Sequence, residues 1–481
     1  MSDRTGSVAA PVPLWIPLLI VGYLVLFVGS TLAFSTVAAL GIGLACLNVA
    51  KRRRLFSVEG YLCALAIYYW LGIANPFHAN VHGFDIPSTT IREMVLLLLV
   101  GSVLLWMGSQ RGRTAATTHD AKPKTEHLAG DPVGLDRIYR ASLTLLVGGC
   151  LVAVLCYARF GIPALADEQD NARTAFVDAL SPYTYYQWLL VEIGIGLAAL
   201  YFANERGTQR PQRRWLLFGT SCAALLVLAG VSSRVTLATP LVLGTIVWWS
   251  QGRRIPWYAV IAGGVSAILV IGLIWIVRIR VLGSIEVYGV EFNFGGGPLE
   301  TARTIGAALS IFARTSIEVF ALFVRGDLPK LHGEIAFMSI IALLPGKQAN
   351  LGLFHVSGLL GYDTFQGTTV SLFGGMYADF GVLGILLMAP VLGWVLGFAE
   401  RRAETGDRLA ALPYAVLLSY YLNMIYGGQM LDVTLLWKLW ICWMALRYIR
   451  TGFPARTRVG LAQGLITVGL YAYGLVRLAL A

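Results

Sequence analysis

Long runs of apolar residues without a charge constrain this chain more than any other feature. The first run, from Leu14 to Ala50, holds 37 residues without Asp, Glu, Lys or Arg. A helix rises about 1.5 Å per residue and about 20 apolar residues cross a bilayer, so this run predicts two membrane spans that meet near Gly29. Only 13% of the chain is charged, against roughly 25% in soluble globular domains. The sequence therefore predicts an all-α polytopic membrane protein and excludes soluble, disordered and fibrous proteins.

Uncharged runs bounded by Lys and Arg clusters predict about twelve or thirteen spans. They cover residues 14–30, 32–50, 56–75, 93–109, 139–158, 183–203, 215–232, 236–250, 256–277, 377–399, 411–431, 433–448 and 459–478. The last run carries Arg477, and an alternative is that it lies on the membrane surface.

The distribution of charge predicts the orientation of the spans. If the N-terminus is cytoplasmic and the loops alternate, the cytoplasmic stretches hold 24 Lys and Arg against 9 Asp and Glu, and the outer loops hold 11 against 15. Cytoplasmic loops of membrane proteins carry such an excess of positive charge. The net charge of +11 therefore reflects membrane topology, and we expect no nucleic-acid partner.

This topology divides the chain into three parts. Residues 1–277 form an N-terminal bundle of about nine spans, residues 278–376 a large external segment, and residues 377–481 the C-terminal helices. A connection of roughly a hundred residues is usually functional. We therefore expect the site in or beside residues 278–376.

Within the external segment, residues 301–325 predict an amphipathic helix. At 100° per residue, its four charged side chains after residue 301 fall on a stripe about 60° wide. They are Arg303, Arg314, Glu318 and Arg325, and Arg314 and Glu318 form an i,i+4 pair. One interpretation is a helix on the outer membrane surface with its charges in water. The other is a helix that lines a water-filled cavity, with its arginines facing a ligand.

Further arginines recur in the predicted outer loops. Arg159 and Arg173 flank the loop after the fifth span, Arg234 lies in the turn Gly230–Arg234, and Arg278 and Arg280 follow the ninth span. Arginine presents a planar fork that matches phosphate oxygens bidentately. These side chains predict an anion site, and the alternative for each is ordinary anchoring at the lipid headgroups.

Two charges fall inside predicted spans, Glu192 in the sixth and Lys438 in the twelfth. Charges at that depth are costly and need partners. They are interpreted either as a proton relay or cavity wall, or as a structural pair.

Metal and cofactor chemistry has little support in the sequence. The six cysteines lie in apolar stretches without a CxxC motif or a Cys/His cluster. We therefore expect no disulfide, no metal site and no cofactor.

Four segments together resemble a known family. They are Arg159-Phe-Gly-Ile-Pro through Asn171-Ala-Arg173, Gly230-Val-Ser-Ser-Arg234, the late loop with Leu344-Pro345, and residues 367–384, GTTVSLFGGMYADFGVLG. In these segments and in topology the chain resembles the Wzy-type polymerases, which join lipid-linked oligosaccharide repeat units into O-antigen, capsule or exopolysaccharide.

The resemblance implies a membrane glycosyltransferase of the C type in the bacterial inner membrane, with its site on the periplasmic side. Arginines would contact the lipid diphosphate: Arg173 and Arg234 by motif position, and Arg278, Arg280 and Arg314 by location. Arg159 belongs to the same set of candidates. Because diphosphate leaves with growing negative charge, fixed cations would stabilise it. The candidate bases for the acceptor hydroxyl are Glu318, His332 and His355.

The implied partners are polyprenyl-diphosphate-linked oligosaccharides and membrane lipids, with a chain-length regulator and a flippase of the same pathway as further partners. Three alternatives stay open. An O-antigen ligase would share the fold and the arginines and differ only in its acceptor. A flippase or other transporter would use Glu192 and Lys438 as a coupling pair. A transferase that uses a simple polyprenyl-phosphate sugar would carry acidic residues in its first outer loop. In this chain the loop between the first two spans is too short, and the next outer loop offers only Asp85.

Overall fold

The computed structural model describes most of the chain, with gaps. The described residues are 31–51, 54–74, 86–119, 132–163, 187–205, 211–230, 234–252, 285–287, 290–292, 298–337, 353–361, 369–405, 407–428, 430–431 and 433–452.

Helices make up nearly all of the described structure. In the first half they are α2 (Thr31–Lys51), α3 (Val58–Ala74), α4 (Ser88–His119), α5 (Pro132–Phe160), α8 (Gln187–Asn204), α9 (Pro211–Ala229) and α10 (Arg234–Ser250). In the second half they are α12 (Pro298–Arg325), α14 (Leu353–Leu359), α15 (Leu372–Phe380), α16 (Val382–Glu404), the 3-10 turn η2 (Arg408–Ala410), α17 (Ala411–Gly427) and α18 (Val433–Thr451). The predicted helical class is confirmed.

One small sheet was not predicted. Strands β1 (Ile285–Val287) and β2 (Val290–Phe292) pair antiparallel, with Glu286 opposite Glu291. It lies at the start of the predicted external segment, just before α12.

The predicted spans that fall on described residues are found as helices, with one difference. The predicted span 377–399 is divided, because Gly381 adopts φ 63° between α15 and α16. A left-handed φ is open to glycine at little cost and ends a helix. The predicted spans 14–30, 256–277 and 459–478 lie outside the described residues.

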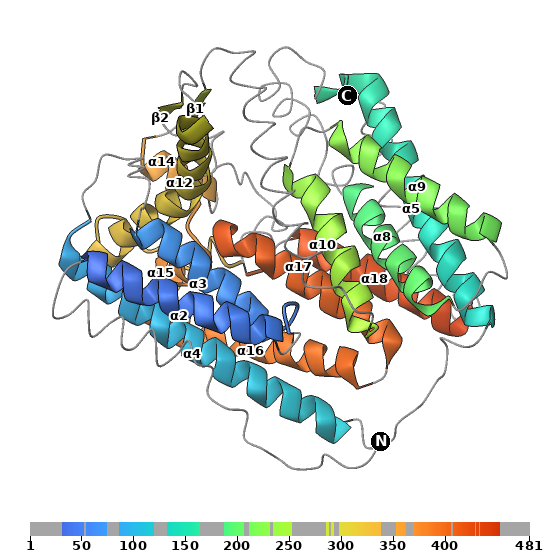
Figure 1. Cartoon of the computed structure of the whole chain (residues 1–481), viewed down its shortest axis with the longest axis horizontal. Helices are drawn as coiled ribbons and strands as arrows, with labels where there is room; N and C mark the ends of the chain where they lie inside the picture. Colours follow the sequence, from blue (N-terminus) through green and yellow to red (C-terminus); the bar gives the residue numbers. More distant parts are fainter. Residues whose placement is uncertain are drawn as a thin grey trace.

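The helices form two groups joined by α17 (Figure 1). One group contains α2, α3, α4, α12, α15 and α16, and the other contains α5, α8, α9, α10 and α18. Helix α17 touches both groups and is buried along most of its length, including Tyr414 and Tyr420. Segments more than three hundred residues apart in the sequence therefore share one core.

The most extensive contact joins α4 to α16, and it depends on glycine. A Cβ atom at Gly108 would collide with the carbonyl oxygen of Pro390, and one at Gly397 with that of Ser109. Small residues allow the backbones of membrane helices to approach closely. These glycines bring the long helix α4 against α16, the helix that follows Gly381.

The outward faces of several helices are strongly apolar. Leu40 and Leu44 on α2, Leu226 on α9, and Leu387 on α16 are each more than half exposed. Among the described residues, four stretches are long and apolar enough to cross a membrane: Ser88–Thr117, Val133–Phe160, Val382–Glu404 and Arg408–Gly427. Exposed leucines on long apolar helices fit a surface that faces lipid, and the chain is a multi-pass membrane protein.

Helix α12 does not lie apart from the bundle. It packs on α3, α4 and α15 (Figure 1), and residues 313–323 are buried throughout. For this half of the helix, the interpretation as a surface helix with its charges in water is wrong, because neighbouring helices cover every side of it.

Candidate functional site

The segment Thr369–Gly384, singled out in the sequence, lies at the centre of the candidate site. It comprises the residues that lead into α15, the whole of α15, the break at Gly381 and the first turn of α16. Ser371 begins α15 with φ 63°, and its hydroxyl accepts a hydrogen bond from the Gly374 amide. A non-glycine residue with a left-handed φ is strained, and such strain is concentrated at functional sites.

Polar side chains hold α12 and α15 against α3. The Tyr68 hydroxyl lies 2.7 Å from the Ser316 hydroxyl, which lies 2.8 Å from Thr369 Oγ1. Tyr69 donates to Ser371 Oγ at 3.2 Å and accepts from the Phe373 amide at 2.9 Å. Because buried polar groups are costly unless satisfied, this network fixes how the three segments meet.

Asp379, near the end of α15, anchors the loop of residues 326–337. Its side chain is fully buried, and its two oxygens accept hydrogen bonds from the amides of Ile335 at 3.1 Å and Ala336 at 2.6 Å. The backbone adds two further bonds, because the amides of Leu331 and His332 donate to the carbonyls of Ala378 and Asp379. The loop is therefore held firmly beside the α15–α16 break.

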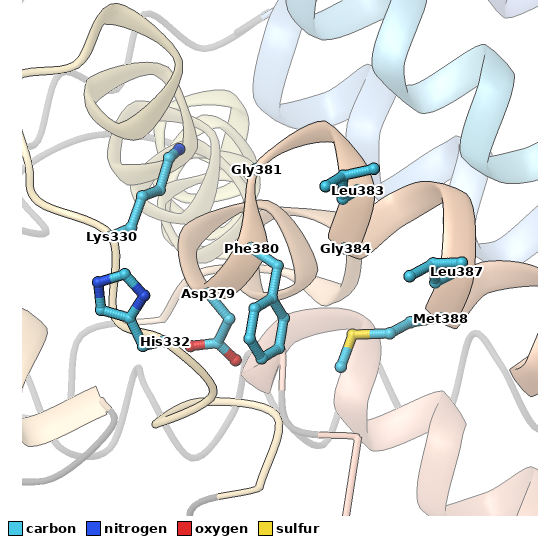
Figure 2. A pocket seen from close by; sticks show the side chains of 9 residues that line it. All are labelled: Lys330, His332, Asp379, Phe380, Gly381, Leu383, Gly384, Leu387 and Met388. Carbon is cyan, nitrogen blue, oxygen red and sulfur yellow. The ribbon is translucent and has the colours of Figure 1, made fainter.

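A pocket of about 540 Å³ opens between this loop and α16 (Figure 2). The surface of the pocket is almost entirely apolar, and Lys330, His332 and Asp379 lie on one side of it. The other side is apolar and consists of Phe380, Gly381, Leu383, Gly384, Leu387 and Met388.

Lys330 is the cation of the pocket. Its amine lies 3.7 Å from the centre of the Tyr377 ring and 3.4 Å from the Tyr377 carbonyl oxygen. Burial lowers the pKa of Lys330 below the usual lysine value. Within the described part of the chain no carboxylate pairs with it.

The two predicted histidines lie on this side of the molecule. His332 lines the pocket and has φ 51°, which is the left-handed region. His355, on α14, lies 2.7 Å from Glu334 through Nδ1 and is partly exposed. A carboxylate that contacts one ring nitrogen orients the imidazole.

The predicted pair Arg314–Glu318 is confirmed, at 2.6 Å between Nε and Oε1. Both side chains are buried, and Arg314 also donates to the carbonyl oxygen of Gly72 at 3.3 Å. The Arg314 guanidinium is thus engaged within the protein. The pair serves to join α12 to α3, and neither residue lines the pocket.

Among the described residues, none of the other predicted arginines lines the pocket. Arg159 is exposed at the end of α5. Arg234 begins α10, and its side chain lies outside the described residues, as do Arg173, Arg278 and Arg280 entirely. Their predicted role in diphosphate binding stays a prediction.

The two charges predicted inside spans form an ion pair. Lys438 Nζ on α18 lies 2.7 Å from Glu192 Oε2 on α8, and both side chains are 7% exposed. Each charge therefore has the partner that its depth requires.

Sequence reasoning missed Lys330, Glu334 and Asp379 as site residues. Asp379 stood within the quoted segment 367–384, where a charge in an apolar run was the available signal. Lys330 and Glu334 had no signal, since only folding brings their loop against α15 and α14. Among the described residues, no group of His, Cys, Asp and Glu has the arrangement of a metal site.

Comparison with known proteins identifies the family. The family model for O-antigen polymerase matches residues 55–437 of the 481, well over half of the chain. No curated protein and no solved structure matches the chain. The matched range contains the whole candidate site, from α3 through α17. The chain therefore belongs to the O-antigen polymerase family.

Proposed function

We propose that this protein polymerises polyprenyl-diphosphate-linked oligosaccharide repeat units into surface polysaccharide at the periplasmic face of the bacterial inner membrane. The match to the O-antigen polymerase family over residues 55–437 carries this proposal. The excess of Lys and Arg in alternate loops supports the orientation, with a cytoplasmic N-terminus and residues 278–376 outside. A chain-length regulator and a flippase of the same pathway are the proposed protein partners.

The proposed reaction transfers a growing glycan from its lipid to a single lipid-linked repeat unit. The bond between the anomeric carbon and the diphosphate oxygen breaks, and a bond from that carbon to an acceptor hydroxyl oxygen forms. The hydroxyl proton passes to a base, and polyprenyl diphosphate leaves. Negative charge grows on the leaving group, so fixed cations at that position would accelerate the reaction.

Arginines of the outer loops are the proposed cations. Arg173, Arg234, Arg278 and Arg280 are the first candidates and Arg159 a further one, because all are expected on the outer side of the membrane. Arg314 is less suited, since its guanidinium already serves Glu318 and the Gly72 carbonyl.

The proposed base is a histidine. Glu318 is fully enclosed and paired with Arg314, so it has no access to an acceptor hydroxyl. His332 lines a pocket, and His355 is partly exposed and oriented by Glu334. Both are within reach of a ligand on the outer side.

Deletion of the gene tests the function directly. We expect the polysaccharide ladder on a gel to collapse to a single repeat unit. If long chains persisted on the carrier lipid, the protein would be a ligase. If repeat units accumulated on the cytoplasmic side, it would be a transporter, and Glu192 and Lys438 would become the residues of interest.

Complementation of that strain tests the roles. We expect combined Ala substitutions of Arg173, Arg234, Arg278 and Arg280 to remove long chains from a well-expressed protein. Loss of a general base typically slows a reaction by ~10²–10⁴-fold. One of the variants His332→Ala and His355→Ala should therefore also lose long chains, and the other should keep them. Wild-type ladders from all of these variants would refute the assignments.

A further inference from the structure

Two arginines at the starts of α5 and α9 share one carboxylate. Arg140 Nε, on α5, lies 2.8 Å from one oxygen of Asp136, and a terminal nitrogen of Arg213, on α9, contacts the other oxygen. The Arg213 guanidinium also lies over the Tyr139 ring, 5.2 Å from its centre. A single carboxylate therefore holds two cations side by side, and together the three side chains keep a net positive charge.

Both guanidinium groups keep donors for a ligand. Arginine has five N–H donors, and Asp136 occupies Nε of Arg140 and one terminal nitrogen of Arg213. The Arg140 side chain is 64% exposed and that of Arg213 is 31% exposed. Because a guanidinium can bind phosphate oxygens through two parallel hydrogen bonds, this pair is arranged in advance for a phosphate group.

The neighbouring residues add positive charge. Arg214 is exposed and forms no ion pair with any residue that the structure describes. Residues 205–214 hold four arginines and one glutamate, and that glutamate, Glu205, accepts a hydrogen bond from the Tyr201 hydroxyl at 3.2 Å. Arg113, on α4, shows the reverse balance, since this one arginine contacts two glutamates.

Apolar side chains continue from these arginines along both helices. Since Arg213 reaches Asp136, α5 and α9 begin at the same end of the bundle, and they pack side by side (Figure 1). Helix α5 is one of those long and apolar enough to cross a membrane. The exposed apolar side chains on the two helices are Val147, Leu151, Phe218 and Leu226.

Trp215 marks the level of the lipid headgroups. It is 71% exposed, and its ring packs edge-on against Phe218 with 6.2 Å between the ring centres. Tryptophan is enriched where a membrane meets water. The arginines beside Trp215 therefore lie at the level of lipid phosphates, and the apolar side chains lie at the level of acyl chains.

We propose that the surface between the starts of α5 and α9 binds a phospholipid with two phosphates and four acyl chains, of the cardiolipin type. Its phosphates lie on Arg140, Arg213 and Arg214, and its chains lie along the apolar faces of both helices. Basic pockets between membrane helices on the cytoplasmic side bind such headgroups, and the charge distribution predicts that this end is cytoplasmic.

Charge and shape select this lipid over other anionic lipids. Arg140, Arg213 and Arg214 face one carboxylate, Asp136, which leaves an excess of two positive charges for two phosphates. Phosphatidylglycerol carries a single phosphate and would neutralise half of that excess. A polyprenyl diphosphate carries a single hydrocarbon chain and would leave one of the two apolar faces uncovered.

Native mass spectrometry of the full-length protein in detergent tests the selectivity. Cardiolipin, phosphatidylglycerol and undecaprenyl diphosphate are titrated separately into delipidated protein. We expect the dissociation constant for cardiolipin to be about tenfold lower than that for either other lipid. Equal affinity for phosphatidylglycerol would overturn the proposal by showing a general preference for anionic lipid, and tighter binding of undecaprenyl diphosphate would overturn it by showing a site for the carrier lipid.

Two substitutions test the arginines. We expect Arg140→Gln and Arg214→Gln each to weaken cardiolipin binding about tenfold. Arg214→Gln removes no ion pair among the described residues, so this variant tests the site even if Arg140→Gln affects folding. Arg111→Gln, at an exposed arginine on α4, is the matched control and should change the affinity less than about twofold. Wild-type affinity in both variants, or an equal loss in the control, would refute the assignment.

Photo-crosslinking tests where the lipid lies. Cardiolipin with a photoreactive acyl chain is incorporated into nanodiscs that contain the full-length protein, and the labelled peptides are mapped. We expect labels in residues 140–151 and 214–226, and equal labelling of the exposed face of α2 would contradict the proposal. These binding measurements need no polymerase activity, so their outcome does not depend on the function proposed for the protein.

Discussion

Charged residues have different kinds of partner in two regions of the molecule. At the end predicted to face the cytoplasm, cations and carboxylates of different helices pair with each other: Arg113 on α4 with Glu400 and Glu404 on α16, and Arg450 on α18 with Asp407. At the opposite end, around the loop of residues 326–337, Arg325 pairs with Asp327 and Glu334 with His355. The carboxylate of Asp379, however, is taken by backbone amides, and among the described residues the Lys330 amine contacts the ring and the carbonyl of Tyr377.

The difference separates two uses of charge. A paired charge stabilises the contact between two helices and has little left to offer a ligand. An amine without a carboxylate costs some stability but keeps its charge available. We therefore interpret the ion pairs of Arg113 and Arg450 as structural and propose that Lys330 is functional, and substitution can test this contrast.

Separating α4 from α16 should have the largest effect on stability, because the ion pairs of Arg113 with Glu400 and Glu404 depend on that contact. A Cβ at Gly397 would collide with the carbonyl oxygen of Ser109, so Gly397→Val forces the two backbones apart. Overpacking costs ~1–3 kcal/mol and more where backbone must move, and we expect little folded protein by size-exclusion chromatography in detergent. Gly219→Val on α9, where a Cβ meets nothing within 4 Å, is the control and should elute as wild type.

Breaking the ion pair between Arg113 and Glu400 should have the next largest effect on stability. Arg113→Met leaves Glu400, 2% exposed, without its partner. Removing one member of a buried pair typically costs about 3–5 kcal/mol, so we expect a clearly lower free energy of unfolding in a denaturant titration. The exposed Arg111 on the same helix provides the control Arg111→Met. Equal stability of the two variants would contradict a structural role for the ion pair between Arg113 and Glu400.

Asp379→Asn should release the loop of residues 326–337 at a smaller cost in stability. The amide can accept at one atom only, so one of the bonds from Ile335 and Ala336 is lost. A hydrogen bond to a charged group contributes ~1.5–3 kcal/mol, and we expect faster hydrogen exchange in residues 331–337 with α4 and α16 unchanged. Asp327→Asn, at an exposed carboxylate paired with Arg325, should leave that exchange unaltered. Protection that stayed at wild-type level in the Asp379 variant would show that backbone bonds alone hold the loop.

Of the four substitutions, Lys330→Gln should have the smallest effect on stability. It should raise stability, whereas the other three lower it. Burial lowers the pKa of Lys330, so folding disfavours its charged form at every pH below the folded pKa. That penalty is present at pH 7 and disappears above about pH 10.4, where the unfolded lysine is also neutral. We expect the variant to be more stable than wild type at pH 7, by less than about 1 kcal/mol because the amine is partly exposed. A loss of stability at pH 7 would place Lys330 among the structural charges instead.

The outcome at α12 shows how far residue patterns reach. Its length, its charged stripe and the Arg314–Glu318 pair followed from helical periodicity, which is a local property. The position of α12 in the fold did not follow from periodicity. The charged stripe fits equally well a water-facing helix and a helix whose charges satisfy each other inside the protein. Contacts with Gly72, Thr369 and Tyr377, distant in the sequence, decide between these, and no local pattern reports them.

The sequence by itself determined the membrane class, the helical spans on described residues, and the resemblance to the repeat-unit polymerases that the family match supports. These depend on hydrophobicity and charge along the chain, since each span satisfies its own backbone within the bilayer. Only the tertiary structure decided that Gly381 divides the predicted span 377–399, that Asp379 fastens the loop of residues 326–337, and that Lys330 packs against Tyr377. Those features arise where segments far apart in the chain pack together, and packing depends on shapes that a single sequence does not display.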